Sequence, residues 1–203
     1  ARRSSDLALK RDDFVLNKDE SLPEVKTVFY LDYDEEFFYA AYECESQGTI
    51  KSTKVDRDSN VWEDDSVELF IDIHNTEESY YHLIINPAGA LYDSKGIKVI
   101  EQIDELTAAL GLNLKPSIKW KEDAAWNSQA IIGTSIAQNQ WSVEIAIPWT
   151  SLTPNGQPPT PGSVWGCNIF RTFYGRKVPE YIAWSATGGS YLQPGKFGKI
   201  IWK

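Results

Sequence analysis

Four carboxylates lie close together in the sequence and are the first candidates for chemistry: Asp64, Asp65, Glu68 and Asp72. Two carboxylates that flank a glycosidic bond can share the acid and base roles of its hydrolysis when they stand about 5 to 10 Å apart. Glu68 and Asp72 lie four residues apart on one face of a predicted strand, and a rise of about 3.3 Å per residue separates them by about 13 Å. That distance is too long for this reaction. Asp64 and Asp65 are better interpreted as turn residues or cation ligands.

Nucleophilic catalysis has little support in the sequence. The only histidines are His74 and His82, and no Gly-x-Ser-x-Gly turn is present. Cys44 and Cys167 both fall in strand-like segments, so they are interpreted as buried free thiols, with a single disulfide between them as the alternative. These patterns predict a protein that is not an enzyme.

Two aromatic side chains at loop positions are the stronger indication of a site. Trp62 stands at the junction of a loop and a strand, and Tyr191 stands in a loop rich in glycine and serine. Rings in such positions either fold back onto the edge of the fold or form a platform for a flat apolar face such as that of a pyranose ring. In the second case Glu68 and Asn86, nearby in the sequence, would hydrogen-bond to hydroxyl groups of the ligand.

Composition and charge restrict the classes of partner. The chain has 203 residues, a formal net charge of −9 and a high aromatic content. Nucleic acids and anionic membranes both require clustered lysine and arginine, so neither is expected as a partner. No apolar run reaches the length of about 18 residues that spans a bilayer, so no membrane insertion is expected. Neutral ligands, cationic ligands and divalent cations remain open.

The elements that must position these residues read as strands. In residues 66–72 the apolar Val67, Leu69 and Ile71 alternate with polar or ligand-facing positions, which is the pattern of a strand with one core face. Many similar short segments, separated by turn signals, predict an all-β antiparallel sandwich in a single domain over residues 1–203, with residues 1–24 as an N-terminal arm that adds an edge strand. Further strands are expected over residues 25–33, 36–45, 80–86, 116–121, 125–135, 140–147, 164–173, 181–185 and 197–202.

One inserted helix is predicted near residues 97–110. Apolar residues recur there at spacings of three and four, and Gly111 is well placed to end a helix. Residues 148–152 are predicted to form a single helical turn or tight corner, because proline ends the preceding strand. The apolar positions of the inserted helix are Ile97, Ile100, Ile103, Leu106 and Leu110.

Six blocks of sequence, in order, resemble the family 9 carbohydrate-binding modules. Together they cover most of residues 25–203, and their order along the chain is more specific than any one of them. The blocks are WEDDSVELFID (62–72), YYHLIINPAGALYD (80–93), WSVEIAIPWTSL (141–152), WGCNIFR (165–171), AWS (183–185) and PGKFGKI (194–200).

This resemblance implies a jelly-roll-like sandwich and non-catalytic binding of a mono-, di- or polysaccharide in polysaccharide breakdown. Two tryptophans grip the end of the glycan in such modules. Trp62 matches the first and Tyr191 takes the place of the second, while Glu68 and Asn86 match polar contacts. Ile84 replaces an arginine of the family, which removes hydrogen-bond donors from the site.

The resemblance also implies bound calcium, with no ligand set that the sequence identifies, and a context outside the cell. We expect a monomer that is secreted, periplasmic or attached to the cell surface, as an accessory module of a bacterial glycoside hydrolase. Two other functions stay open. The sandwich could be a scaffold or protein-interaction domain that has lost the sugar site, or a haem-binding relative with His74 or His82 as axial ligands.

Overall fold

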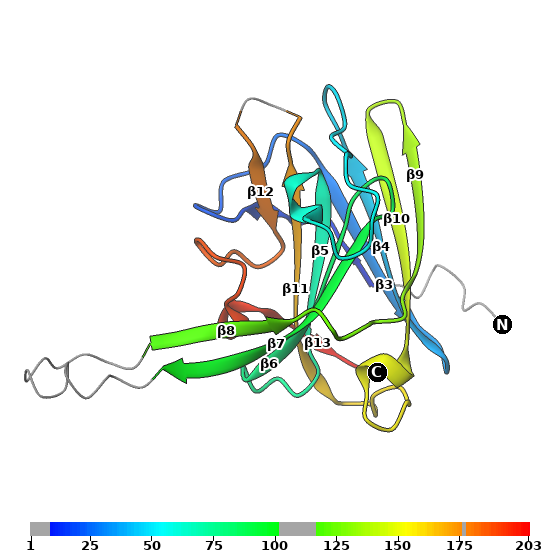
Figure 1. Ribbon diagram of the computed structural model, residues 1–203, viewed down its shortest axis with the longest axis vertical. Coiled ribbons are helices and arrows are strands. Elements are labelled where there is room, and N and C mark those ends of the chain that lie inside the picture. Colours follow the sequence, from blue (N-terminus) through cyan, green and yellow to red (C-terminus); the bar gives the residue numbers. More distant parts are fainter. Residues whose placement is uncertain (1–8, 102–116, 176–177) are drawn as a thin grey trace, which may run out of the picture.

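The computed structural model describes residues 9–101, 117–175 and 178–203, and in these residues two antiparallel β-sheets pack into a sandwich (Figure 1). The smaller sheet has the strand order β1-β3-β4-β10-β9. In that order its strands are Leu9–Arg11 (β1), Thr27–Tyr33 (β3), Phe37–Glu45 (β4), Gln140–Pro148 (β10) and Ile131–Ala137 (β9). The all-β sandwich predicted from the alternation is confirmed.

The larger sheet has the order β2-β12-β11-β5-β6-β7-β8, and β13 pairs with β11 beside this path. In chain order its strands are Val15–Leu16 (β2), Ser66–Asp72 (β5), Ser79–Ile85 (β6), Leu91–Glu101 (β7), Ser117–Asp123 (β8), Val164–Phe173 (β11), Glu180–Ala183 (β12) and Gly198–Ile201 (β13). The strands β5, β6, β7 and β8 are neighbours in this order, each antiparallel to the next. Side chains of one parity on these four strands therefore share one face of the sheet.

The hydrophobic core lies between the two sheets. Val67, Leu69 and Ile71 of β5 are fully buried in it, as their alternation predicts. Trp165 and Trp202 pack edge to face 4.8 Å apart between ring centres, and both are buried together with Trp141, as predicted. Aromatic rings dominate this core because each removes a large apolar surface from water.

Cys44 and Cys167 are both buried in the core as free thiols, which confirms the interpretation that favoured thiols over a disulfide. Burial disfavours the thiolate, so it raises the pKa of Cys44 to about 11 and that of Cys167 to about 12. Both groups are therefore protonated and unreactive near neutral pH.

Short helices and the N-terminal arm complete the fold. Pro148 precedes the helical turn Trp149–Leu152 (α2), as predicted, and the 3-10 turns are Val61–Glu63 (η2) and Pro194–Lys196 (η3). The arm adds an edge strand to each sheet, β1 beside β3 and β2 beside β12, which is one more than predicted. In the described residues no helix is long and apolar enough to cross a membrane.

The helix predicted near 97–110 is wrong over its first five residues. Residues 97–101 continue β7 and pair with residues 117–121 of β8, and the two strands form a long ribbon that extends from the body (Figure 1). Ile97, Val99 and Ile100 are β-branched residues that suit a strand, and pairing with β8 satisfies their backbone groups. Residues 102–110 lie outside the described residues.

Candidate functional site

The side chains of β5 that do not enter the core lie on the outer face of the larger sheet, which is turned away from the core. Glu68 and Phe70 lie on it as the alternation predicts, yet all seven residues of β5 are buried. Val67, Leu69 and Ile71 are buried in the core, and on the outer face the segment after β12 folds over Phe70. Phe197 packs on Phe70 with ring centres 5.4 Å apart, and Tyr191 packs beside them. The outer face is therefore a partly covered surface and not a fully hydrated one.

A charged triad lies on this face across three strands. His82 of β6 contacts two carboxylates, with Nε2 2.9 Å from Glu68 Oε2 on β5 and Nδ1 2.9 Å from Glu122 Oε1 on β8. The hydroxyls of Ser94 and Tyr80 donate to the same Glu122 oxygen at 3.2 and 3.3 Å. An ionised carboxylate only accepts hydrogen bonds, so the imidazole can satisfy both acids only when both of its nitrogens bear protons.

The charges of the triad stabilise one another. Burial by itself would lower the pKa of His82, but the hydrogen bonds to Glu122 and Glu68 outweigh it and raise that pKa. Burial would raise the pKa of Glu122, but the bond from His82 and its positive charge outweigh it and lower that pKa. Two carboxylates and one imidazolium leave the triad with one net negative charge.

The sequence patterns named His82 only as a candidate haem ligand and did not indicate Glu122. Tyr80, His82 and Ile84 alternate on β6, and Trp120 and Glu122 share a face of β8, so the alternation gives a weak signal for both. The strand predicted over residues 116–121 stopped one residue before Glu122, which the structure places inside β8. The 40 residues between His82 and Glu122 hide their contact from any local pattern.

Trp62 lies at the rim of this face in η2, and 43% of its surface is exposed. Its ring meets Tyr92 of β7 edge to face, with ring centres 5.4 Å apart and an interplanar angle of 88°. Asp64 and Asp65 follow Trp62 after one intervening residue, and they hold the loop of residues 51–54. Asp64 accepts hydrogen bonds from the backbone of Thr53 and Lys54, which makes it a loop-fixing residue.

A row of ring contacts connects Trp62 with Tyr191 across the sheet. Successive ring centres lie within 6.1 Å of each other, and two of the contacts are nearly parallel stacks: His82 on Phe70 at 3.9 Å, and Phe170 on Tyr191 at 3.8 Å. The row places both predicted aromatic residues over one face, at its two ends. In order it runs Trp62, Tyr92, His82, Phe70, Phe170 and Tyr191.

Glu68 stands between the two ends of this row, since it pairs with Phe170 on one side and Ile84 on the other. Tyr191 is half-buried, because one face of its ring lies on Phe170. Burial and then the charge of Glu68 raise the pKa of Tyr191 well above its usual value, so the hydroxyl stays protonated. Glu68 and Tyr191 are thus brought together by the fold.

Asn86 is fully buried and its amide already has partners in the chain. The side-chain nitrogen donates to the carbonyl of Lys54 at 2.8 Å and to Asp64 Oδ2 at 2.9 Å, and the oxygen accepts from Ala90 N at 2.9 Å. This geometry fixes the loop behind Trp62. It assigns Asn86 a supporting position and leaves it without surface for a ligand.

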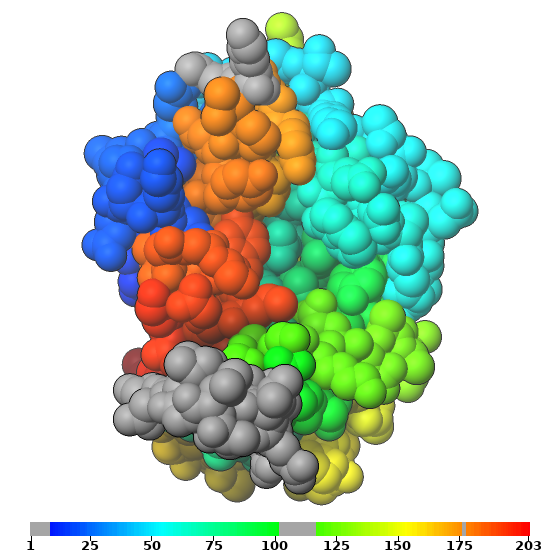
Figure 2. Space-filling model, turned by 60° about the vertical axis from the view of Figure 1, so that its left-hand side comes forward, coloured from blue at the N-terminus to red at the C-terminus, as the bar shows by residue number. Residues whose placement is uncertain are grey.

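The space-filling view shows the hollow above the outer face (Figure 2). The cyan surface near residues 50–65 forms one wall, the orange and red surface near residues 180–195 forms the opposite wall, and green residues lie at the bottom between them. Trp62 and Tyr191 belong to the segments that form the two walls of this hollow. We refer to it as the groove.

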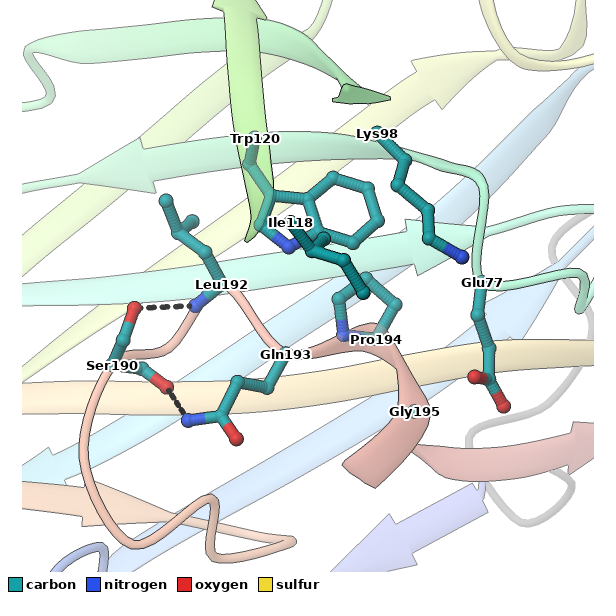
Figure 3. A pocket seen from close by; sticks show the side chains of 9 residues that line it. All are labelled: Glu77, Lys98, Ile118, Trp120, Ser190, Leu192, Gln193, Pro194 and Gly195. Carbon is teal, nitrogen blue, oxygen red and sulfur yellow. Dashed lines mark hydrogen bonds between the residues drawn. The ribbon is translucent and has the colours of Figure 1, made fainter. Parts of the chain in front are cut away.

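A pocket of about 460 Å³ lies between β8 and the segment 190–195 (Figure 3). Trp120 of β8 forms one wall, and its ring lies 5.1 Å from that of Tyr80. None of the residues predicted for the site lines this pocket. The lining residues are Glu77, Lys98, Ile118, Trp120, Ser190, Leu192, Gln193, Pro194 and Gly195.

The described residues bear on the calcium and haem expectations through the partners of their acidic and histidine side chains. They contain no group of three or more acidic, histidine or cysteine side chains placed to hold a metal ion. The oxygens of Asp64 and Asp65 face backbone N–H donors, which a cation would repel. Both ring nitrogens of His82 face carboxylates, so neither is free for haem iron. Calcium stays a prediction of the sequence resemblance.

Comparison with known proteins identifies the family. The chain matches the model of carbohydrate-binding family 9 over residues 12–201. It therefore belongs to carbohydrate-binding family 9, a family of non-catalytic binding modules. The resemblance inferred from the six sequence blocks is confirmed.

The chain is also similar to parts of known proteins. It is 27% identical over 175 residues to endo-1,4-beta-xylanase A of Thermotoga maritima, an alignment that covers 83% of this chain and 13% of the xylanase. Among solved structures, a candidate carbohydrate-binding protein from Bacteroides uniformis has a TM-score of 0.72 and 16% identity, with 98% of this chain and 88% of that chain covered.

A family 9 module from Caldicellulosiruptor kristjanssonii, in complex with glucose, has a TM-score of 0.61 and 17% identity, with 95% of this chain and 84% of that chain covered. The same module is also solved with cellotriose. At these identities the likeness concerns the fold.

Proposed function

We propose that this chain binds the end of a carbohydrate, as a mono- or disaccharide or as the terminal unit of a polysaccharide, in the groove between Trp62 and Tyr191. The observation that supports this proposal is the exposed ring of Trp62 at one rim, with Tyr191 at the other end of the same aromatic row and Glu68 between them. Family membership supports carbohydrate as the ligand class.

Each residue has a physical role in this proposal. The exposed ring of Trp62 covers the C–H face of a pyranose, and burial of apolar surface contributes about 25 cal/mol per Å². Glu68 uses only one oxygen for His82, so its second oxygen can accept a hydrogen bond from a sugar hydroxyl. Tyr191 limits the groove on the opposite side, and Asn86 holds the loop that supports Trp62.

The biological setting follows from the relatives. The stretch shared with xylanase A of Thermotoga maritima is a small part of that enzyme. We infer that this chain acts as an accessory module that holds a polysaccharide-degrading enzyme, outside the cell, on its substrate. The catalytic step then belongs to a different domain.

Replacement of Trp62 by alanine tests the proposal. Titration calorimetry with glucose, cellotriose, xylose and xylotriose is expected to give dissociation constants in the micromolar to millimolar range for at least one sugar, about −8 to −4 kcal/mol. Trp62→Ala removes the platform at an exposed position, so we expect affinity to fall by at least about tenfold while the fold is kept.

Tyr30→Ala is the matched control, because Tyr30 is a partly exposed aromatic residue on β3 of the smaller sheet. It should leave affinity unchanged. If no sugar in a broad panel gives a heat of binding, or if Trp62→Ala binds like the unmodified protein, the proposal is wrong. A scaffold or interaction domain that has lost the sugar site would then be the better description.

A further inference from the structure

In the triad on the outer face of the larger sheet, the hydrogen bonds of His82, Ser94 and Tyr80 engage only one oxygen of each carboxylate. Glu68 binds His82 through Oε2, and Glu122 accepts all three of its hydrogen bonds on Oε1. The Glu122 side chain is 24% exposed, whereas those of His82 and Glu68 are 5% and 6% exposed. Glu122 is therefore the open end of an otherwise buried charged unit.

The surroundings place Glu122 on the Trp62 side of the groove. His82, which binds it, lies 6.1 Å from Tyr92 between ring centres, and Tyr92 in turn contacts Trp62. Burial, and then the charge of Glu122 and a hydrogen bond to it, raise the pKa of Tyr92, so the two side chains are neighbours. A sugar that rests against Trp62 thus approaches the open end of the triad.

We propose that Glu122 is a second ligand-contacting carboxylate, locked to Glu68 by the imidazolium of His82, and that this negatively charged floor selects neutral or amine-bearing sugars and rejects uronic acids. The inference rests on the proposed function of the groove. Two fixed acceptors suit hydroxyl and ammonium donors. A sugar carboxylate brought to the same floor would meet like charges with little water between them.

The fixed position of the acceptors matters as much as their charge. His82 is stacked on Phe70 and holds Glu68 and Glu122 from both nitrogens, so neither carboxylate must be ordered when a ligand binds. Acceptors that are ordered beforehand increase affinity because less conformational entropy is lost on binding. His82 is thus a positioning residue, and Glu122 is the contact.

The test compares three sugars that share a pyranose ring and differ in charge: glucose, glucosamine and glucuronate, titrated at about pH 6, where the amine is protonated. We expect the unmodified protein to bind glucosamine at least as tightly as glucose, and glucuronate at least about tenfold more weakly. Glu122→Gln keeps the shape and removes the charge. We expect Glu122→Gln to reduce the ratio of the dissociation constants for glucuronate and glucosamine by about tenfold.

A purely structural role for Glu122 would change the affinity for all three sugars by the same factor. Glu144→Gln on β10 is the control, because it removes the same charge from an exposed site on the smaller sheet and should leave the ratios unchanged. If glucose binds but Glu122→Gln leaves the ratios unchanged, this inference is wrong and the proposed function stands. If the unmodified protein binds none of the three and no other sugar, both are wrong.

Discussion

His82 determines the charge balance of the groove at the scale of single residues. The groups that face it are Glu68 from β5, Glu122 from β8, Tyr80 from its own strand and Tyr92 from β7. Only the two carboxylates are charged near neutral pH. A neutral imidazole has one N–H, so it can satisfy one of them and must turn a lone pair toward the other.

The folded state should therefore be most stable over a limited pH range. The pKa of His82 is raised above 6.5, so its stabilising contribution is complete below about pH 6.5 and is lost as pH rises through the raised value. The pKa of Glu122 is lowered below 4.5, so its contribution is present above about pH 4.5 and is lost as pH falls through the lowered value.

Urea unfolding between pH 4 and pH 9 measures this effect, with His82→Gln as the comparison. We expect the difference in free energy of unfolding between the two proteins to be largest near pH 5 to 6 and to shrink as pH rises. A difference that stays constant across this range would show that His82 is not an imidazolium in the folded protein.

Glu68 and Trp62 could be named as candidate contacts from sequence because each has a local signal, an alternation in one case and a loop junction in the other. His82 and Glu122 could not, because their meaning depends on which strands become neighbours. Asn86 shows the converse. Its motif position suggested a ligand contact, but the three hydrogen bonds that bury it depend on Lys54 and Asp64, which only the folded loop brings close.

At the scale of elements, Asp64 attaches the loop before η2 to β6. Its carboxylate accepts hydrogen bonds from Thr53 N at 2.7 Å, Thr53 Oγ1 and Lys54 N at 2.8 Å, and Asn86 Nδ2 at 2.9 Å. Trp62 lies two residues before it. The position of the exposed ring thus depends on a buried carboxylate that is not among the proposed ligand contacts.

Asp64→Ala should separate this loop from its support. Hydrogen bonds to a charged group contribute about 1.5 to 3 kcal/mol each and are not additive, so we expect a loss of about 3 kcal/mol in free energy of unfolding by urea titration. Sugar affinity should fall as well. Asp56→Ala, an exposed neighbour in the same loop, should stay within about 0.5 kcal/mol, and an equal effect of both changes would contradict the assignment.

The ribbon of β7 and β8 shows why one element was mispredicted. Ile97 and Ile100 share a helical spacing, but the same spacing occurs in a strand whose end contains Ile97, Val99 and Ile100. Whether this segment forms a helix or a strand depends on β8, which follows after residues 102–116 and pairs with residues 95–101. A local periodicity cannot report a partner strand so far along the chain.

At the scale of the whole molecule, Arg171 joins the two sheets. It belongs to β11 of the larger sheet and is fully buried, and its guanidinium donates to Lys26 O at 3.0 Å, to Thr27 Oγ1 at 3.1 Å and to Glu45 O, all on the side of the smaller sheet. The sandwich thus has a polar connection within an otherwise apolar core.

Arg171→Leu should destabilise the sandwich because it removes the guanidinium donors to Thr27 Oγ1 and to the carbonyl groups of Lys26 and Glu45, and Lys26 O then keeps only its hydrogen bond from Glu45 N. We expect a loss of about 3 kcal/mol or more in free energy of unfolding, measured by urea titration. Lys18→Leu, at an exposed position of the arm, is the control and should have little effect. A stability of Arg171→Leu equal to that of the unmodified protein would show that the sheets hold together by apolar packing alone.

The exposed position of Trp62 has an optical consequence. All eight tryptophans lie in the described residues, and Trp62 is the only one that is exposed. Acrylamide in solution quenches an indole that it can reach, and the emission of an indole moves to shorter wavelength when water leaves its face. The protein therefore has a fluorescent reporter at the rim of its groove, with other tryptophans such as Trp141 and Trp149 shielded in the core as an internal reference.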